Sequence, residues 1–165
     1  MGTRMKTALG ALFALYLAFL LYLTLIGRTP SFASVAECFR ERGSLIPFHT
    51  IIRQTSALIG GRYSVRLYVM NVAGNLAAFA PFGFFLPALF PKCRKFLPFF
   101  LILSLSIVAV EIAQLLFRVG SLDVDDYILN ALGAVAVFFL LKTKPGRALT
   151  SKIYREAQNT DKDEK

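Results

Sequence analysis

The chain has 165 residues, of which 56% are hydrophobic and only 18% are charged, and it contains 16 Phe and no Trp. Soluble domains average about 45–50% apolar and about 25% charged residues, so the composition excludes an ordinary soluble domain, and its hydrophobicity excludes a disordered chain. A net charge of +9 would suggest nucleic acid in a soluble protein, but basic residues also gather in the loops beside membrane spans. We therefore expect a small polytopic membrane protein that binds no nucleic acid.

Four apolar stretches predict four transmembrane helices. A span needs about 20 mostly apolar residues, and residues 7–26, 68–90 and 96–117 satisfy that length. The fourth stretch, 127–141, reaches full length only as 122–141, with three Asp at its start. The predicted fold is all-α, an integral membrane bundle of four transmembrane helices over residues 1–142 with an interfacial segment between the first two. A basic to mixed-charge cytoplasmic tail would follow over residues 143–165.

The distribution of Lys and Arg predicts the orientation. Twelve basic residues lie on the side of the N-terminus, the 91–95 loop and the tail, against seven on the other side. Basic residues favour the cytoplasmic side, which places both termini in the cytoplasm. All seven on the outer side are Arg, whereas eight of the twelve inner ones are Lys. Because the Arg fork binds phosphate or carboxylate bidentately, this split indicates anion binding, with chance in a small sample as the alternative.

Shorter patterns in the sequence predict local features of the segments and spans. In the outer segment, Phe32, Val35, Ala36 and Phe39 share one helical face, which is typical of a helix that lies on a membrane surface. In the second span, Pro81 removes a backbone hydrogen bond and predicts a kink. Gly74 and Ala78 in the same span are four residues apart and would permit close helix contact. Of the two cysteines, Cys38 is expected outside and Cys93 inside.

Polar side chains inside the spans are the candidate functional site, because such residues are costly in lipid and usually mark function. Spacings of three or four residues put those of each helix on one face. At the rise of a helix, the three stripes meet at a similar depth near the outer end. An alternative is that they only tie the helices together. The candidates are Asn71, Asn75, Glu111, Gln114, Arg118, Asp123, Asp126 and Asn130.

The run Asp123-Val124-Asp125-Asp126 permits two interpretations. Carboxylates at this spacing could hold Mg²⁺ beside a phosphate. Alternatively, Asp123 caps the fourth helix and Asp126 lies in its first turn, where the helix dipole favours an acid. We expect no resident metal or cofactor, and no residue is assigned a catalytic role.

These stripes also carry a resemblance to a known family. Asn71-x-x-Gly74-Asn75-x-x-x-Phe79-x-Pro81-x-Gly83 resembles the second-span signature of the VanZ-like membrane proteins. Glu111-x-x-Gln114-x-x-x-Arg118 and Asp123-x-Asp125-Asp126-x-x-x-Asn130-x-x-Gly133 are similar to its third-span and fourth-span signatures. The loop Leu45-Ile46-Pro47-Phe48 also matches, although Ser44 stands where an Asn is more usual. The resemblance covers about residues 7–142 and implies a protein of the bacterial cell membrane.

The founding member of that family is associated with low-level resistance to the glycopeptide teicoplanin. The resemblance therefore implies an envelope protein whose outer-leaflet polar site interacts with membrane lipids, a lipid-linked cell-wall precursor or a lipoglycopeptide. One alternative is an enzyme acting on a phosphorylated envelope lipid, with Glu111 as base and the Asp cluster holding a metal. Another is a small proton-coupled transporter that uses Glu111 as its proton site. The enzyme is less favoured because the sequence shows no nucleophile–base pair and no phosphate-binding loop.

Overall fold

The structure is a computed structural model that describes residues 3–26, 29–120, 122–148 and 150–151, with side chains from residue 5 onward. The regular elements within these ranges are all helices, joined by turns and loops, apart from an isolated parallel bridge between Ser44 and Asp123. The all-α expectation is therefore confirmed. The helices are α1 (Thr3–Leu21), extended by a π-helical turn η1 (Tyr22–Ile26), then α2 (Val35–Arg42), α3 (His49–Ile59), α4 (Val65–Ala78), α5 (Phe82–Leu89), the 3₁₀ turn η2 (Pro91–Arg94), α6 (Phe96–Leu116) and α7 (Val124–Leu140).

Three stretches of the described chain are helical, long enough and apolar enough to cross a membrane. They are Met5–Ile26, Val65–Leu89 and Phe96–Leu116. The second combines α4 and α5 and begins three residues before the predicted 68–90. The fourth predicted span corresponds to α7, which has 17 residues and covers about 26 Å at helical rise.

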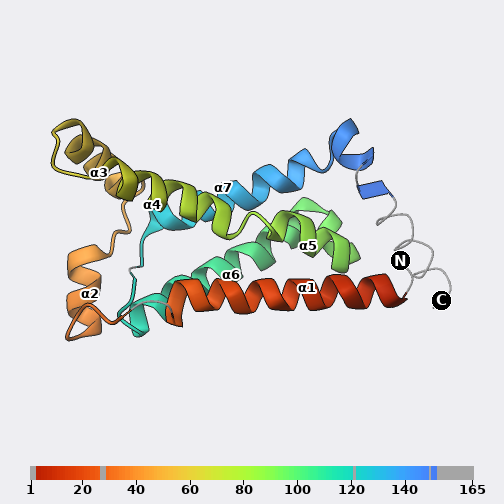
Figure 1. The fold of residues 1–165 in the computed structure, drawn as a ribbon, viewed down its shortest axis with the longest axis horizontal. Coiled ribbons are helices and arrows are strands. Elements are labelled where there is room, and N and C mark those ends of the chain that lie inside the picture. The colour runs from red at the N-terminus through yellow and green to blue at the C-terminus, as the bar shows by residue number, and fades with distance from the viewer. Residues whose placement is uncertain (1–2, 27–28, 121, 149, 152–165) are drawn as a thin grey trace.

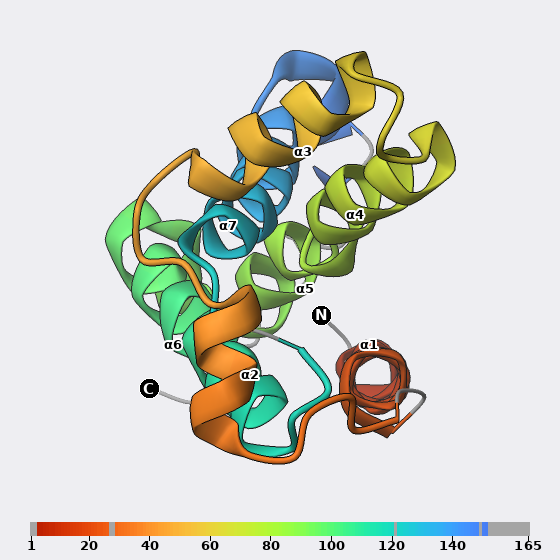
Figure 2. The ribbon, with the colours of Figure 1, turned by 90° about the vertical axis from the view of Figure 1, so that its left-hand side faces the viewer.

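The long helices form a bundle whose members alternate in direction (Figure 1). In that view α1 and α6 run from right to left, and α4–α5 and α7 run from left to right. The short helices α2 and α3 lie together at the left, at what we call the α2–α3 end of the bundle. Seen from that end, α2 lies over α6 and α3 lies over α7 and beside α4 (Figure 2).

The predicted kink at Pro81 is confirmed as a break between two helices. α4 ends at Ala78 and α5 begins at Phe82, with tight turns between them, including a hydrogen bond from the Ala80 N–H to the Ala77 carbonyl. The carbonyl of Ala78 at this break accepts a hydrogen bond from the Tyr16 hydroxyl of α1. Since an unpaired backbone carbonyl in hydrocarbon costs several kcal/mol, Tyr16 makes the broken helix tolerable inside a membrane.

The last helix, α7, packs against α4, α5 and α6 through small residues. A Cβ on Gly133 would lie 1.8 Å from the Leu76 carbonyl oxygen, and one on Gly83 would lie 2.3 Å from the Ala134 carbonyl oxygen. The backbones of α4 and α5 therefore touch α7 directly. The prediction that Gly74 provides such a contact was wrong, because a Cβ there would meet nothing within 4 Å. Gly74 lies on the opposite, exposed side of α4.

The segment of residues 29–67, expected on the outer side, contains the two short helices α2 and α3. α2 begins with a capping box, in which Ser34 accepts from the Glu37 N–H and the Glu37 carboxylate accepts from the Ala33 N–H. Val35 and Phe39 are exposed to the same extent, 38% each, whereas the neighbouring Cys38 is fully buried. An apolar face is thus available to a membrane surface. Of the predicted tail, residues 144–148 and 150–151 are helical, and 152–165 lie outside the described residues.

Candidate functional site

Four polar side chains form a hydrogen-bonded chain across three helices. Gln54 of α3 accepts from the Asn71 amide of α4 at 3.1 Å, and Asn71 accepts from the Asn75 amide at 3.4 Å. The same Asn75 amide donates to Asp126 Oδ1 of α7 at 2.6 Å. Two of the predicted stripes, those of α4 and α7, therefore do meet, and the chain extends them to α3. We call these residues the amide chain.

Two buried carboxylates at the start of α7 hold the start of α3. Both oxygens of Asp125 accept backbone N–H groups there, one from Phe48 and one from Ile51 at 3.0 Å. Asp123 Oδ2 accepts from the Thr50 hydroxyl at 2.6 Å. The first turn of a helix has N–H groups without partners inside the helix, so Asp125 acts as a cap supplied by another helix. Phe48, which precedes α3, adopts a left-handed φ of 65°.

Glu111 of α6 contacts the same cluster through Asp123. It is only 4% exposed, and its Oε2 accepts the Asp123 N–H at 3.4 Å. Asp123 is itself the N-cap of α7, because its Oδ1 accepts from the Asp125 N–H at 2.9 Å. The capping interpretation of Asp123 is therefore confirmed, and Asp126 lies in the first turn as expected.

Gln114 and Arg118, the other two candidates from the third predicted span, do not contact this cluster and instead bond to backbone carbonyls elsewhere. Gln114 donates to the Thr24 carbonyl at 3.3 Å, beyond α1. Arg118 lies past the end of α6 with a left-handed φ of 59°. The Val119 N–H bonds to the Gln114 carbonyl and the Arg118 N–H to the Leu115 carbonyl, the two bonds of a Schellman motif. The guanidinium of Arg118 then reaches the carbonyls of Phe32 and Ala33, so it holds the segment between α1 and α2 and does not join the amide chain.

Asn130 is the most unusual member of the candidate set. Its side chain is only 4% exposed, and its Oδ1 has no hydrogen-bond partner among the described residues. It lies four residues after Asp126 and three before Gly133, both of which contact α4, so it shares the α7 face that meets α4. A buried acceptor without a partner costs about 1–3 kcal/mol. Asn130 is thus a position where a donor from outside the chain would be stabilising.

The three acidic side chains at the start of α7 point to three different sets of partners. Asp123 faces Thr50, Asp125 faces the α3 backbone, and Asp126 faces Asn75. Among the described residues, no group of three or more His, Cys, Asp or Glu side chains could hold a metal ion. Each of these carboxylates thus contributes at least one hydrogen bond to helix packing or capping.

Sequence reasoning missed the contribution of α3 and of the loop before it. Gln54 and Thr50 were absent from the predicted site, yet each bonds a predicted residue. Gln54 and Thr50 are four residues apart and so share one face of an amphipathic helix, and this spacing could have indicated that they face the polar site. Ser44 also joins, through backbone hydrogen bonds with Leu122 and Val124, and its hydroxyl lies 3.3 Å from His49 Nδ1.

The thiol of Cys38 is buried against the loop after α6. Its Sγ lies 2.9 Å from the Gly120 carbonyl oxygen, to which it donates. Burial raises the pKa of the Cys38 thiol from its ordinary value of 9.0, while Arg42 and Arg118 oppose the shift. The second cysteine, Cys93 in η2, is 1% exposed, and burial raises its pKa as well. Both thiols are therefore poorly reactive in the folded protein.

The fold and the polar cluster together define a helical membrane protein with apolar helices and a hydrogen-bonded network at one end. The chain belongs to the VanZ/LLP1 family, whose model matches residues 13–145. This match confirms the family resemblance and covers all the candidate site residues. The comparisons found no match among the curated proteins and none among the solved structures.

Proposed function

We propose that this chain is a four-span protein of the bacterial cell membrane whose polar network, at the outer leaflet, binds or shields a lipid-tailed envelope ligand. The ligand would be a lipid-linked cell-wall precursor or a lipoglycopeptide, and the result would be low-level resistance to teicoplanin. The observation that carries the proposal is the convergence of polar side chains from α3, α4, α6 and α7 at the α2–α3 end.

The alternating helix directions support a fourth span. α7 runs parallel to α4–α5 and begins at the end where α6 finishes (Figure 1). Its start at Asp123 is hydrogen-bonded to the loop before α3, so the acidic residues need not face lipid. A four-span arrangement puts the N-terminus and the tail on one side, and the count of basic residues favours the cytoplasm for that side.

The contacts favour binding over catalysis. A general base needs a carboxylate or imidazole within reach of a substrate proton. Asp123, Asp125 and Asp126 each already accept hydrogen bonds from neighbouring helices. Asn130 Oδ1, in contrast, is an acceptor without a partner among the described residues, which suits recognition of a donor on a ligand.

Growth inhibition by teicoplanin, with vancomycin alongside, tests the proposal in a susceptible Gram-positive host. The host carries empty vector, the wild-type chain, Glu111→Gln or Asn130→Leu. A Gln at position 111 still accepts the Asp123 N–H, and a Leu at position 130 removes a buried unpaired oxygen with the same number of side-chain heavy atoms, so we expect both variants to fold. Leu132→Ala, on the exposed side of α7, is the control.

We expect the wild type and Leu132→Ala to protect against teicoplanin more than against vancomycin. Both site variants should lose protection at normal membrane levels. No protection by a well-expressed wild type would contradict the resistance proposal. Full protection by both site variants would show that the network only holds the helices together.

A further inference from the structure

The hairpin formed by α3 and α4, residues 49–78, contains three Arg and no Asp or Glu. Arg53 lies on α3, Arg62 in the connecting turn and Arg66 in the first turn of α4, and all three are exposed. Within the part of the chain that the structure describes, none of the three forms a salt bridge. The hairpin lies at the α2–α3 end of the bundle, where α4 enters its apolar stretch (Figure 1).

The other outer arginines of the described chain have different surroundings. Arg118 binds two backbone carbonyls, and the Arg42 guanidinium lies 5.0 Å from the centre of the Phe32 ring. Arg40 shares α2 with Glu37 and Glu41. The hairpin arginines therefore lie on an exposed segment that carries no acidic residue of its own.

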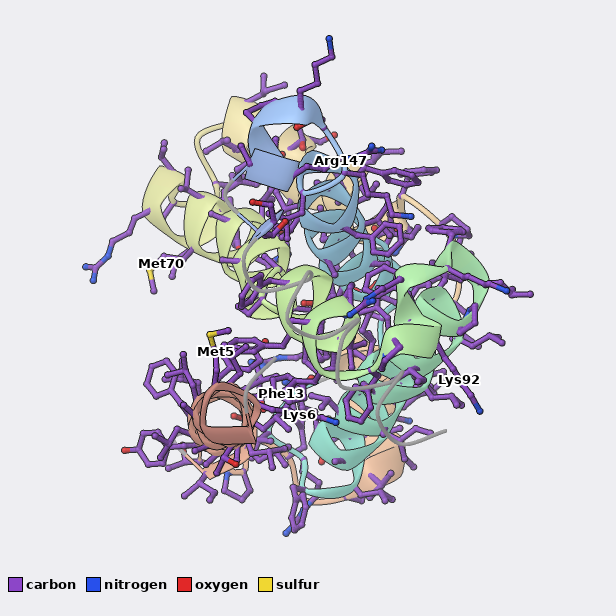
Figure 3. The ribbon with its side chains drawn as sticks, turned by 90° about the vertical axis from the view of Figure 1, so that its right-hand side faces the viewer. Met5, Lys6, Phe13, Met70, Lys92 and Arg147 are labelled. Carbon is purple, nitrogen blue, oxygen red and sulfur yellow. The ribbon has the colours of Figure 1, made fainter. Side chains whose placement is uncertain are left out.

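Apolar side chains lie beside these arginines on the exposed faces of both helices. On α3, Ile52 is 62% exposed and Ile59 is 83% exposed. On α4, Val69 and Met70 follow Arg66 by about one turn and are more than half exposed. Figure 3 shows Met70 projecting from α4 on the side away from α7. Arg66 thus lies at the α2–α3 end of an exposed apolar stripe on α4.

We propose that the α3–α4 hairpin binds the phosphate headgroup of an anionic lipid, with Arg53, Arg62 and Arg66 as its cationic partners and an acyl chain along the Val69–Met70 side of α4. Arg suits this role because its planar fork pairs with two phosphate oxygens at once. The polar faces of the same helices are occupied by contacts to each other, since Thr55 bonds Tyr68 and Gln54 bonds Asn71. This site rests on the proposed function and adds to it the class of ligand, an anionic lipid, that the outer surface would bind.

The absence of Trp from the chain makes a direct assay available. Tyr63→Trp, in the turn between α3 and α4, provides a single fluorophore beside Arg62. The full-length variant is reconstituted into phosphatidylcholine vesicles that contain either brominated phosphatidylglycerol or brominated phosphatidylcholine, with the bromines at the same acyl position. Quenching at equal mole fraction reports which lipid lies next to the hairpin. Because the vesicles are symmetric, the result does not depend on the orientation of insertion.

We expect brominated phosphatidylglycerol to quench at a mole fraction several-fold lower than brominated phosphatidylcholine, since one basic residue near a membrane surface favours an anionic lipid by about fivefold. Arg53→Gln/Arg62→Gln/Arg66→Gln should abolish this preference. Lys92→Gln/Lys142→Gln/Lys144→Gln, which removes the same charge from the other end of the bundle, should leave it unchanged. Thermal unfolding of each variant verifies that it is folded.

Equal quenching by the two lipids, or a preference that survives the triple Arg change, would overturn the inference. Loss of the preference in millimolar inorganic phosphate would assign the site to a free anion and overturn the lipid assignment. The assay uses no antibiotic, so its failure is distinct from a failure of teicoplanin protection.

Discussion

Asn75 of α4 donates its side-chain amide to the Asp126 carboxylate of α7 across 2.6 Å, and this bond joins the two helices at the centre of the polar network. Both residues are partly buried, so the bond forms where water has limited access. The Asn75 amide also lies 3.4 Å from the Asn71 oxygen, which connects the pair to Gln54 of α3. The side-chain amides of Asn75 and Asn71 together therefore link α7, α4 and α3.

We expect Asn75 and Asp126 to be energetically coupled. In a double-mutant cycle of Asn75→Ala and Asp126→Ala, the coupling free energy should be about 0.6–1.7 kcal/mol, the range of interhelical hydrogen bonds in a membrane bundle. Unfolding in mixed micelles measures it. Asn75→Ala combined with Leu132→Ala, on the exposed side of α7, should be additive within about 0.5 kcal/mol. Additivity of the first pair would mean that the bond contributes nothing.

Close backbone contact at Gly133 should make this position intolerant of a side chain. Gly133→Ala would place a methyl group against the Leu76 backbone, and the helices would have to separate. We expect a loss of about 1–3 kcal/mol in the free energy of unfolding. Gly74→Ala, where a Cβ meets nothing within 4 Å, is the matched control and should lose no stability, because Ala is favoured over Gly by about 0.5–1 kcal/mol at an open helical position. Equal effects of the two substitutions would contradict the observed α4–α7 contact.

The left-handed backbone at Arg118 predicts an inverted order of substitutions. Arg118→Ala and Arg118→Gly both lose the hydrogen bonds to the Phe32 and Ala33 carbonyls. Only Gly adopts a φ of 59° without steric cost, so Arg118→Gly should be more stable than Arg118→Ala by about 1 kcal/mol. Thermal unfolding of the two variants gives the order. An Ala variant as stable as the Gly variant would contradict the Schellman motif.

The buried Cys38 thiol predicts a decline in stability at alkaline pH. Because burial raises its pKa in the folded state, the unfolded chain loses this proton first as the pH rises past about 9. The stability that the protonated Cys38 thiol contributes is fully present below the pKa of the unfolded chain. It is lost as the pH rises through the higher pKa of the folded protein. The difference in unfolding free energy between wild type and Cys38→Ala, measured from pH 7 to pH 10, should therefore shrink with pH. A constant difference would show that the thiol does not titrate differently on folding.

The sequence predicted the helical class, the kink at Pro81 and the cap at Asp123, because each depends on local chemistry: apolar length, a missing N–H and a short polar side chain before a helix. It did not predict the docking of α3. That docking depends on Asp125 accepting N–H groups from a segment more than 70 residues earlier in the chain, and local patterns carry no such information. It also put Arg118 on the Glu111 stripe, since continuation of the α6 helix was assumed where a left-handed residue ends it.

The central claim is that the polar network lies at the outer face of a four-span bundle. Labelling of intact Gram-positive cells with an impermeant thiol reagent tests it most directly. The native cysteines are unsuitable reporters, because both are buried. Leu45→Cys, at a 65% exposed position beside the network, and Lys92→Cys, at an exposed position at the opposite end, provide reporters in the native background. We predict labelling of Cys at position 45 and none at position 92 until the cells are permeabilised. Labelling at position 92 alone would contradict the claim and place the network at the cytoplasmic leaflet.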